Sequence, residues 1–315
     1  SICWFFQLYS FSRRNSGLEF KGNFMSQKRA LFVHAHPDDE TINNGATMAQ
    51  MIEDGIAVTL ITCTRGEEGE VLVPELSHLA SSAEDNLGAH REIELSNAMN
   101  ELGVVDHRFL GKTNTHTKIY RDSGMLDTPP NQRPDCFWRA DVEQAAKELA
   151  EIIDEVKPQV MVTYDEIGGY GHPDHIQTHR VAMRAAELST WKIQKIYWNI
   201  MPKSIVKQGM DAMKKLGSDF FGAENIDELP FVKDDSLVTT VIHAPEQVEK
   251  KMAAMKAHAT QISVDGPFFA LSNNLGVQVF GDEYYTLVKG EKSPPYEKAF
   301  NNIDLEVDLF SGVAL

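Results

Sequence analysis

The chain has 315 residues, of which 42% are hydrophobic and 24% are charged, and its formal net charge is -16. This composition is typical of a globular protein with one large domain or two smaller ones. The negative charge repels nucleic-acid phosphates and anionic lipid headgroups, so it argues against both as partners and favours a small uncharged or cationic ligand. The three cysteines are not closely spaced, which argues against a disulfide framework and predicts a protein of the reducing cytoplasm.

The first 24 residues differ from the rest of the chain. Apolar and aromatic residues come first, and Arg13 and Arg14 follow them, which reverses the order found in a signal peptide. No stretch of the sequence reaches the about 18 apolar residues that a membrane helix needs. We interpret Met25 as the natural start and predict that residues 1–24 are an extension outside the fold. An anchoring or docking arm is the alternative interpretation.

Strands and helices alternate from residue 28 to about residue 200. Short apolar runs with β-branched residues predict buried strands over residues 28–34, 56–63, 104–110, 159–164 and 195–200. Apolar residues at helical spacing, together with start and stop signals, predict helices over residues 41–54, 82–102, 141–156 and 176–188. Because strand–helix–strand units close into parallel sheets, the pattern predicts a three-layer, Rossmann-like α/β domain with a mostly parallel sheet over residues 25–200.

The chain after residue 200 is less regular. Its clearest elements are a β-like run, a helix and a short strand, at residues 237–243, 245–261 and 284–288. Residues 111–138 have no clear periodicity, and a segment this long without periodicity is usually a lid, a binding loop or disordered chain. Residues 201–236 are less regular than the first half of the chain. The second segment includes a predicted cover loop at residues 219–230. We predict that residues 201–315 form a smaller α/β region that packs on the first domain and covers the substrate.

Two histidine-rich motifs follow predicted strands. His36-Pro37-Asp38-Asp39-Glu40 comes after the first strand, and His172-Pro173-Asp174-His175 comes after the fourth. In open α/β sheets ligands bind beyond the carboxyl ends of the strands, so the two motifs are expected to meet there. Either motif alone fits an ordinary turn at a helix start, whereas the pair favours a catalytic metal site.

The residue types in these motifs suit hydrolysis with a bound metal. A catalytic zinc takes three protein ligands and leaves one position for water, and two histidines with one carboxylate provide such a set. The metal lowers the pKa of its water to about 7, and a second carboxylate can take the proton of that water. A nearby histidine or tyrosine can stabilise the oxyanion. Nitrogen and oxygen ligands also suit iron(II) or manganese.

The motifs resemble those of the LmbE-like (PIG-L) metal-dependent deacetylases of N-acetyl sugars. Ala35–Glu40 and Gly171–His175 carry this resemblance, which extends over roughly residues 28–285. Within the family, the chain resembles the deacetylases of mycothiol biosynthesis. That finer resemblance rests on Asn44–Thr47, Cys63–Thr64, Gly66–Val71, Arg121–Met125, Val162–Asp165, Gly168–Gly171 and Ala257–Gln261.

The resemblance implies a hydrolase that removes the N-acetyl group of N-acetylglucosaminyl-inositol with one zinc ion per subunit, or iron(II) in its place. It implies that His36, Asp39 and His175 bind the metal and that Asp38 is the general base. The pattern of the family further implies that Tyr170 polarises the amide carbonyl.

The remaining roles that the resemblance implies concern the leaving group and the substrate. His172, oriented by Asp174, would stabilise the oxyanion or protonate the leaving amine. The sugar and inositol hydroxyls would be bound by Glu70, Arg91 and Asp122.

Some of these residues also have ordinary structural interpretations. Arg91 fits a solvated helix face, and Glu70 and its neighbours fit a solvated loop. His34 points the same way as His36 on a strand, and we expect it to pack behind the ligands rather than bind the metal. His258 lies on an amphipathic helix, where it would either pack or support the site from behind.

One position separates two activities of the family. The amidases that cleave mycothiol S-conjugates resemble this chain but have a lysine shortly after the first motif. Thr41–Gly45 contains no lysine here, which favours the deacetylase. The amidase and a deacetylase of another N-acetyl amino sugar stay open as alternatives. A non-catalytic sugar or nucleotide module is a weaker alternative, because no Gly-x-Gly-x-x-Gly or Walker pattern follows the first strand.

Overall fold

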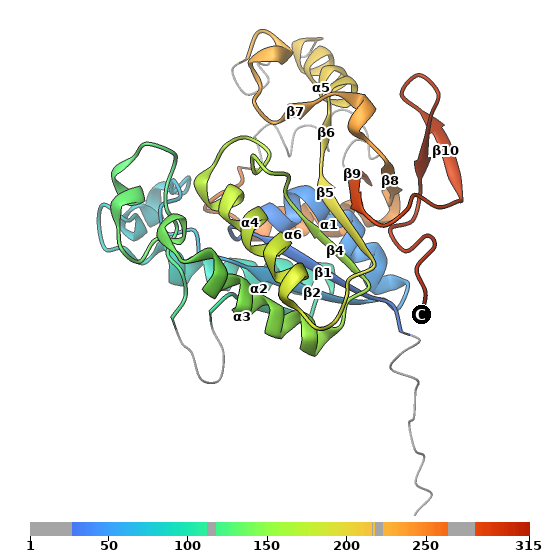
Figure 1. Ribbon diagram of the computed structural model, residues 1–315. Helices are drawn as coiled ribbons and strands as arrows, with labels where there is room; N and C mark the ends of the chain where they lie inside the picture. Colours follow the sequence, from blue (N-terminus) through green and yellow to red (C-terminus); the bar gives the residue numbers. More distant parts are fainter. Residues whose placement is uncertain (1–26, 112–117, 216, 218–222, 264–280) are drawn as a thin grey trace, which may run out of the picture.

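A computed structural model describes the protein over residues 27–111, 118–215, 217, 223–263 and 281–315 (Figure 1). The predicted extension, residues 1–24, lies outside the described residues, as do residues 219–222 of the predicted cover loop. Within the described chain, nine strands form one sheet in the order β10-β11-β8-β9-β5-β4-β1-β2-β3. None of the described helices is long and apolar enough to cross a lipid bilayer.

The first half of the chain forms the parallel part of the sheet. Each neighbouring pair in the order β5-β4-β1-β2-β3 is parallel. These strands are β1 (Arg29–His34), β2 (Ala57–Thr62), β3 (Asp106–Phe109), β4 (Val160–Thr163) and β5 (Lys195–Asn199). All six residues of β1 are buried, since the strand lies in the middle of the sheet with layers on both faces. The predicted strands and the predicted α/β fold are confirmed.

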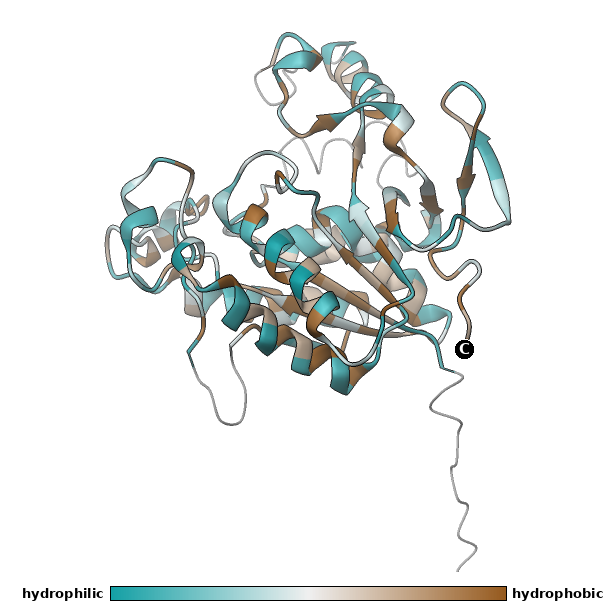
Figure 2. Ribbon diagram, in the orientation of Figure 1, coloured by the Kyte–Doolittle hydropathy of each residue, from teal (hydrophilic) through white to brown (hydrophobic). Residues whose placement is uncertain are grey.

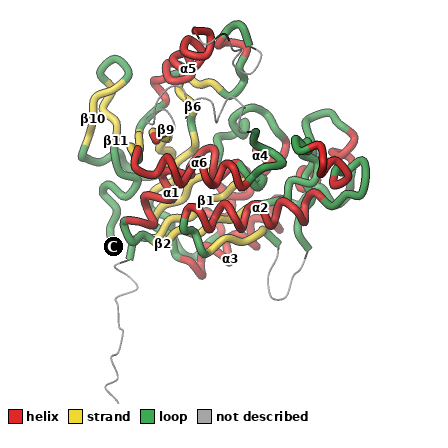
Figure 3. The backbone as a smooth tube through the Cα atoms, turned by 180° about the vertical axis from the view of Figure 1, so that it is seen from behind, coloured by secondary structure: helices red, strands yellow, loops and turns green. Residues whose placement is uncertain are grey.

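Helices cover both faces of this part of the sheet, as the views from the two sides show (Figures 1 and 3). Ala30 and Phe32 of β1 pack in one core with α1 (Asp39–Glu53), α2 (Leu87–Leu102) and α6 (Val248–Ala257). Leu31 and Val33 point the other way and pack in a second core with α3 (Val142–Val156) and α4 (Pro173–Leu188). Alternate residues of one strand therefore join two cores, and hydrophobic colour concentrates between the layers (Figure 2).

Two helices begin at positions that differ from the prediction. α2 starts at Leu87 rather than Ser82, because Asp85 has φ 55° and cannot continue a right-handed helix. α4 starts at Pro173 rather than Ile176, because proline suits the first helical position and His172 caps the helix. Consequently the second histidine motif, predicted as loop, lies in the first turn of α4.

The second half of the chain extends the same sheet. β9 (Asp282–Lys289) pairs antiparallel with β5 and with β8 (Thr240–His243). β10 (Tyr296–Ala299) and β11 (Ile303–Glu306), which the sequence pattern did not predict, complete the edge. The predicted division of the chain near residue 200 stays a prediction, and the hydrogen bonds of β5 and β9 cross it.

A small unit stands over the carboxyl end of β5 (Figure 1). It consists of α5 (Lys203–Lys215) and the short strands β6 (Met201–Pro202) and β7 (Val232–Lys233). The sequence pattern predicted no helix in the less regular residues 201–236, but α5 lies there and its buried Val206, Met210 and Met213 recur at helical spacing. The predicted helix at residues 245–261 is shorter, since α6 follows a 3₁₀ turn and ends at Ala257.

Several loops contain short 3₁₀ helices. They are η2 (Pro74–Leu79), η3 (Pro129–Gln132), η4 (Phe137–Arg139), η5 (Ile226–Glu228), η6 (Asp235–Leu237) and η7 (Pro245–Gln247). η3 and η4 lie in the segment after β3 that was predicted to lack periodicity, residues 111–138, of which residues 112–117 are outside the described part.

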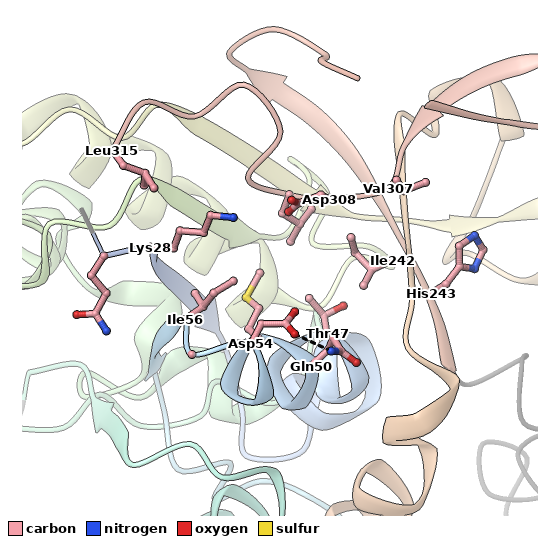
Figure 4. A pocket seen from close by; sticks show the side chains of 14 residues that line it. Lys28, Thr47, Gln50, Asp54, Ile56, Ile242, His243, Val307, Asp308 and Leu315 are labelled. Atoms are coloured by element: carbon pink, nitrogen blue, oxygen red, sulfur yellow. Dashed lines mark hydrogen bonds between the residues drawn. The ribbon is translucent and has the colours of Figure 1, made fainter. Parts of the chain in front are cut away.

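Two cavities lie at opposite edges of the sheet. One, of about 690 Å³, is bounded by residues around the start of β1, the end of α1 and the C-terminal tail (Figure 4). Gln50 donates a hydrogen bond of 3.0 Å to Asp54 beside it. The other, of about 630 Å³, opens at the carboxyl ends of β1 and β4 and is lined by Asp38, Asp39 and His175. In open α/β sheets ligands bind beyond the carboxyl ends of the strands, so the second cavity is the candidate ligand site.

Candidate metal centre and active site

The two histidine motifs meet at the carboxyl edge of the sheet, as predicted from their positions after β1 and β4. His36 follows β1, and His175 lies in the first turn of α4. The centroids of the two imidazole rings are 5.3 Å apart. Two loops separated by more than a hundred residues thus place histidine and aspartate side chains in one cluster.

His36 has one ring nitrogen committed to a carboxylate. Its Nε2 donates to Asp174 Oδ2 at 2.9 Å, and the same carboxylate accepts from the backbone N–H and the hydroxyl of Ser123. When the ring is neutral, as it must be to bind a metal, the lone pair of His36 is on Nδ1, which lies 3.4 Å from Asp39 Oδ2. Although burial lowers it, the neighbouring carboxylates of Asp122, Asp174 and Asp39 raise the pKa of His36 well above its usual value. The cluster therefore favours positive charge.

His175 presents a lone pair to the same point. Its Nδ1 lies 3.1 Å from the carbonyl oxygen of Gly168, which can only accept, so Nδ1 carries the proton. Its Nε2 is buried, hydrogen-bonds no group in the described chain, and lies 3.2 Å from Asp39 Oδ2. Two acceptor atoms that face each other at this distance repel unless a metal ion or a second proton on the imidazole lies between them. Burying such an atom without a partner is otherwise costly.

Among the described residues, two groups could hold a metal ion, and they share His36. The first consists of His36, Asp39 and His175, and the second of His36, Asp122, His172 and Asp174. In the second group the carboxylates already have partners, because Asp122 accepts from the N–H groups of Gly124 and Glu68 and Asp174 accepts from His36 and Ser123. In the first group the buried His175 Nε2 has no hydrogen-bond partner among the described residues, and two histidines with one carboxylate match a catalytic metal site. The donor atoms of the first group therefore fit a metal ion better.

The orientation of Asp39 is set by two donors. Its Oδ2 accepts from Tyr164 Oη at 3.0 Å and from the backbone N–H of His36 at 3.0 Å. Behind Tyr164, His34 Nδ1 lies 2.9 Å from the phenol oxygen and His34 Nε2 lies 2.6 Å from Asn44 Oδ1. His34 thus supports the cluster from behind, as expected, and Asp39 is the aspartate that faces the two histidines.

Asp38 points to a different partner and has a strained backbone. Its Oδ2 lies 3.4 Å from Nη2 of Arg91. Its φ of 130° and ψ of -35° are rare for a residue with a side chain and cost on the order of 1–3 kcal/mol. Burial raises the pKa of Asp38 to about 7, with Arg91 opposing and Asp39 reinforcing the shift. A carboxylate with this pKa accepts a proton more readily than an ordinary aspartate, which suits a general base.

His172 is held as a neutral hydrogen-bond donor. It caps α4, and its Nδ1 accepts the backbone N–H of Asp174 at 3.1 Å, which leaves the proton of the neutral ring on Nε2. Burial lowers the pKa of His172 to about 3, and the charges of His36 and His175 reinforce this. The carboxylate of Asp174 contacts His36, so Asp174 orients His172 through its backbone N–H.

Tyr170 lies at the mouth of the cleft. Its side chain is 39% exposed and its ring meets that of His175 edge to face, with 5.0 Å between centroids. Burial of the phenol and nearby Asp39 raise the pKa of Tyr170, so the hydroxyl stays protonated and can donate. The loop before it depends on Gly168, whose φ is 62° and where an added Cβ would lie 2.4 Å from the Cβ of His175.

The three predicted substrate residues lie in different environments. Asp122 is buried, with Oδ1 3.5 Å from His36 Nε2. Arg91 is only 3% exposed and donates to the carbonyl oxygens of Pro37 and Gly66, so the interpretation of a solvated helix face is wrong. Glu70 is exposed, and its carbonyl oxygen accepts from Gln261 Nε2 at 2.9 Å.

Several residues around the cluster had no assigned role in the sequence. Tyr164 and Ser123 hold the carboxylates of Asp39 and Asp174. Both lie in stretches that carry the finer family resemblance, and that was the available signal. Glu40, which also had no assigned role, forms a buried pair with His258 with 2.6 Å between Oε1 and Nε2, so His258 has the supporting position that was one of its two expected roles.

The fold and this cluster define a class of α/β proteins with a group of histidine and aspartate side chains at the carboxyl edge of the sheet that could hold a metal ion. The family model described as PIG-L, GlcNAc-PI de-N-acetylase, matches residues 31–186. The chain belongs to this family, and it is 51–54% identical to curated deacetylases over most of its length.

Two of these relatives carry the same descriptive name. The 1D-myo-inositol 2-acetamido-2-deoxy-alpha-D-glucopyranoside deacetylase of Geodermatophilus obscurus is 54% identical over 299 residues, 91% of this chain and 98% of the relative. The deacetylase 1 of that name from Catenulispora acidiphila is 51% identical over 301 residues, 91% of this chain and 90% of the relative. The resemblance drawn from the motifs is confirmed.

Solved structures with lower identity share the fold. N,N'-diacetylchitobiose deacetylase from Pyrococcus horikoshii is 19% identical, with a TM-score of 0.52 over 87% of this chain and 88% of that one. The 4-carboxy-2-hydroxymuconate hydratase of Pseudomonas putida is 18% identical, with a TM-score of 0.53 over 85% of this chain and 99% of that one. Since a hydratase shares the fold, the chemistry must be argued from the site.

Proposed function

We propose that this protein hydrolyses the N-acetyl group of 1D-myo-inositol 2-acetamido-2-deoxy-alpha-D-glucopyranoside in mycothiol biosynthesis. The names of relatives at 51–54% identity over 91% of the chain support this substrate. The observation that carries the chemistry is the convergence of His36 Nδ1 and His175 Nε2 on Asp39 Oδ2, at 3.4 Å and 3.2 Å, with His175 Nε2 buried and without a hydrogen-bond partner among the described residues. These three residues would hold one zinc ion, with iron(II) as the alternative metal.

Three residues of the site have separate proposed roles in the hydrolysis. A metal ion in this site supplies a Lewis acid and lowers the pKa of water to about 7. Asp38 takes a proton from the attacking water, whose oxygen forms a bond to the carbonyl carbon of the acetamide. Tyr170 polarises the carbonyl, and the Nε2 proton of His172 stabilises the oxyanion. The proton on Asp38 then passes to the nitrogen as the C–N bond breaks, which gives acetate and the free amine.

Asp174 and the substrate-binding residues complete the proposal. Asp174 fixes the proton of His36 on Nε2, and its backbone N–H donates to Nδ1 of His172, which caps α4. Asp122 and Glu70 are proposed to bind sugar and inositol hydroxyls. Arg91 has the same proposed role from the family pattern, but its contacts with Pro37 and Gly66 support a role in holding the loop of the base.

The same site supports two related alternatives. Amide cleavage of a mycothiol S-conjugate and deacetylation of another N-acetyl amino sugar need the same base and oxyanion donor. The absence of a lysine from Thr41–Gly45 favours deacetylation of the sugar–inositol, and Ile42 of this stretch lines the cleft. The relatives named above are deacetylases, so a non-catalytic module is no longer proposed. A cytoplasmic location is proposed and is supported by Cys63 and Cys136, which are free and buried.

The experiment that tests this function compares substrates with the metal controlled. The protein is stripped with a chelator, reloaded with zinc or iron(II), and assayed for acetate and free amine in parallel. We expect equal amounts of both from the sugar–inositol, and a kcat/KM that exceeds that for N-acetylglucosamine alone. Preferential cleavage of a mycothiol S-conjugate would transfer the assignment to the amidase. Full activity of the Asp38→Ala variant would contradict the assigned base.

A further inference from the structure

The peptide bond between Pro37 and Asp38 is held from both sides. Arg91 of α2 donates to the carbonyl oxygen of Pro37 through Nη2. On the opposite side, the N–H of Asp38 donates to Oε2 of Glu40 at 2.9 Å. Fixing a peptide plane fixes the starting direction of the next side chain. At Asp38 this matters more than usual, because a φ of 130° is a conformation that the residue would leave if it were free.

Glu40 is itself locked by a second residue. Its other oxygen, Oε1, accepts from the hydroxyl of Thr41 at 2.7 Å and pairs with Nε2 of His258 at 2.6 Å. Both members of the Glu40–His258 pair have no solvent exposure. His258 caps the C-terminus of α6, which packs against α1 and α2. His258, a residue far along the chain, thus fixes the position of the Glu40 carboxylate, which accepts from the N–H of Asp38.

We infer that Glu40, locked by His258, is the positioning residue that holds Asp38 in its catalytic orientation. The inference rests on the proposed function, in which Asp38 is the base. The carboxylate of Asp38 lies 3.4 Å from Arg91 and lines the cleft beside Asp39. Without the acceptor on Glu40, the Asp38 N–H loses this partner and φ relaxes toward a common value. The carboxylate then turns away from the point where water must attack.

A second buried ion pair provides a matched control. Glu283 also joins α1 to α6, since its carboxylate accepts from the N–H groups of Ala46 and Thr47 and pairs with Lys251 at 2.7 Å. Its side chain is nearly as enclosed as that of Glu40, with 3% exposure against 0%. It contacts the middle of α1 rather than the loop of the base. Loss of Glu283 therefore weakens the same helix packing without releasing Asp38.

The experiment compares Glu40→Ala, Glu40→Gln, His258→Ala and Glu283→Ala in the metal-loaded protein. We expect Glu40→Ala to keep its metal and its KM while kcat falls about 100-fold, the loss that a displacement of about 1 Å produces. Glu40→Gln retains an oxygen that accepts from Asp38, so it should recover most of that loss. His258→Ala should lose about tenfold in kcat, because Glu40 remains but is no longer locked. Glu283→Ala should have a lower Tm and an unchanged kcat.

Each outcome decides the inference. A kcat within twofold of wild type in both Glu40→Ala and His258→Ala would overturn it, provided that Asp38→Ala is inactive. If Asp38→Ala is active, the proposed base fails instead, which separates the two failures. An equal loss of kcat in Glu283→Ala would also overturn the inference, since general packing would then explain the effect. If Glu40→Ala does not fold, His258→Ala and Glu40→Gln still decide, because each keeps a polar partner in place.

Discussion

The hydrogen bond of 2.9 Å between Nε2 of His36 and Oδ2 of Asp174 determines which nitrogen of His36 faces the metal site. Because a neutral imidazole has one proton, the Asp174 carboxylate places that proton on Nε2 and leaves the lone pair on Nδ1. Nδ1 is the atom beside Asp39. Asp174 of the second motif thereby sets the orientation and proton position of His36, a proposed metal ligand in the first motif.

Replacing Asp174 by asparagine should weaken metal binding. The amide group cannot accept from His36 and from both donors of Ser123 at once, so the imidazole loses its fixed proton position. We expect metal affinity to fall by about 10–100-fold, the usual effect of losing such a partner. Competition with a chromophoric chelator measures this. Glu143→Gln, which changes an exposed partner of Arg184, is the control and should bind metal like the wild type; equal affinity in both variants would contradict the role of Asp174.

Replacing Asp38 by asparagine should remove most turnover and leave the metal bound. Loss of a general base typically costs about 10²–10⁴-fold in kcat. For the wild type, burial raises the pKa of Asp38 to about 7, and the base acts only when ionised. Activity should therefore be full above this pKa and fall as the pH drops through it.

Two measurements check the assignment of Asp38. Elemental analysis should find the same metal content in Asp38→Asn and in the wild type, since Asp39 rather than Asp38 faces the histidines. The pH–rate profile of the residual activity should lose the acid limb. A retained acid limb in this variant would mean that another group is the base.

Replacing His172 by alanine should lower kcat by about 10²–10³-fold, the cost of one oxyanion donor. Its pKa is lowered to about 3, so it binds a second proton only below that pH and stays neutral in any practical assay. The pH–rate profile of the variant should therefore keep the shape of the wild type. If the alkaline limb disappeared instead, His172 would act as a charged acid that protonates the leaving amine.

Replacing Glu306 by alanine should destabilise the sheet between β5, β8 and β11. Its carboxylate accepts from Lys195, Tyr197 and Thr240, and the Lys195–Glu306 pair is buried with 2.5 Å between charged atoms. Removing one member of a buried pair costs about 3–5 kcal/mol, because the other charge is left without its partner. Urea denaturation measures the change in the free energy of unfolding.

The control for Glu306 is Glu155→Ala, which breaks an exposed pair with Arg108 at 3.0 Å. Exposed pairs contribute about 0–1 kcal/mol, so this variant should unfold close to the wild type. Similar values for the two variants would show that the buried pair contributes little.

Much of the fold was predictable because the parallel strands are buried on both faces. β1, β2 and β4 contain short apolar runs. Such a run can be recognised from the local sequence alone, without knowing which strands lie next to it. β10 and β11 were missed for the opposite reason. Their partly exposed residues give no apolar run, and they are stable as strands only through pairing with each other and with β8.

Local sequence by itself determined that His36, Asp39 and His175 would lie at one edge of a parallel sheet, since each follows or caps an element that ends there. Only the tertiary structure decided what each side chain does there. The proton of His36 is placed by Asp174, and the strained backbone of Asp38 is held by Glu40 and His258. These contacts join residues up to 218 positions apart, and hydrogen-bond geometry over such separations is set by packing of whole helices.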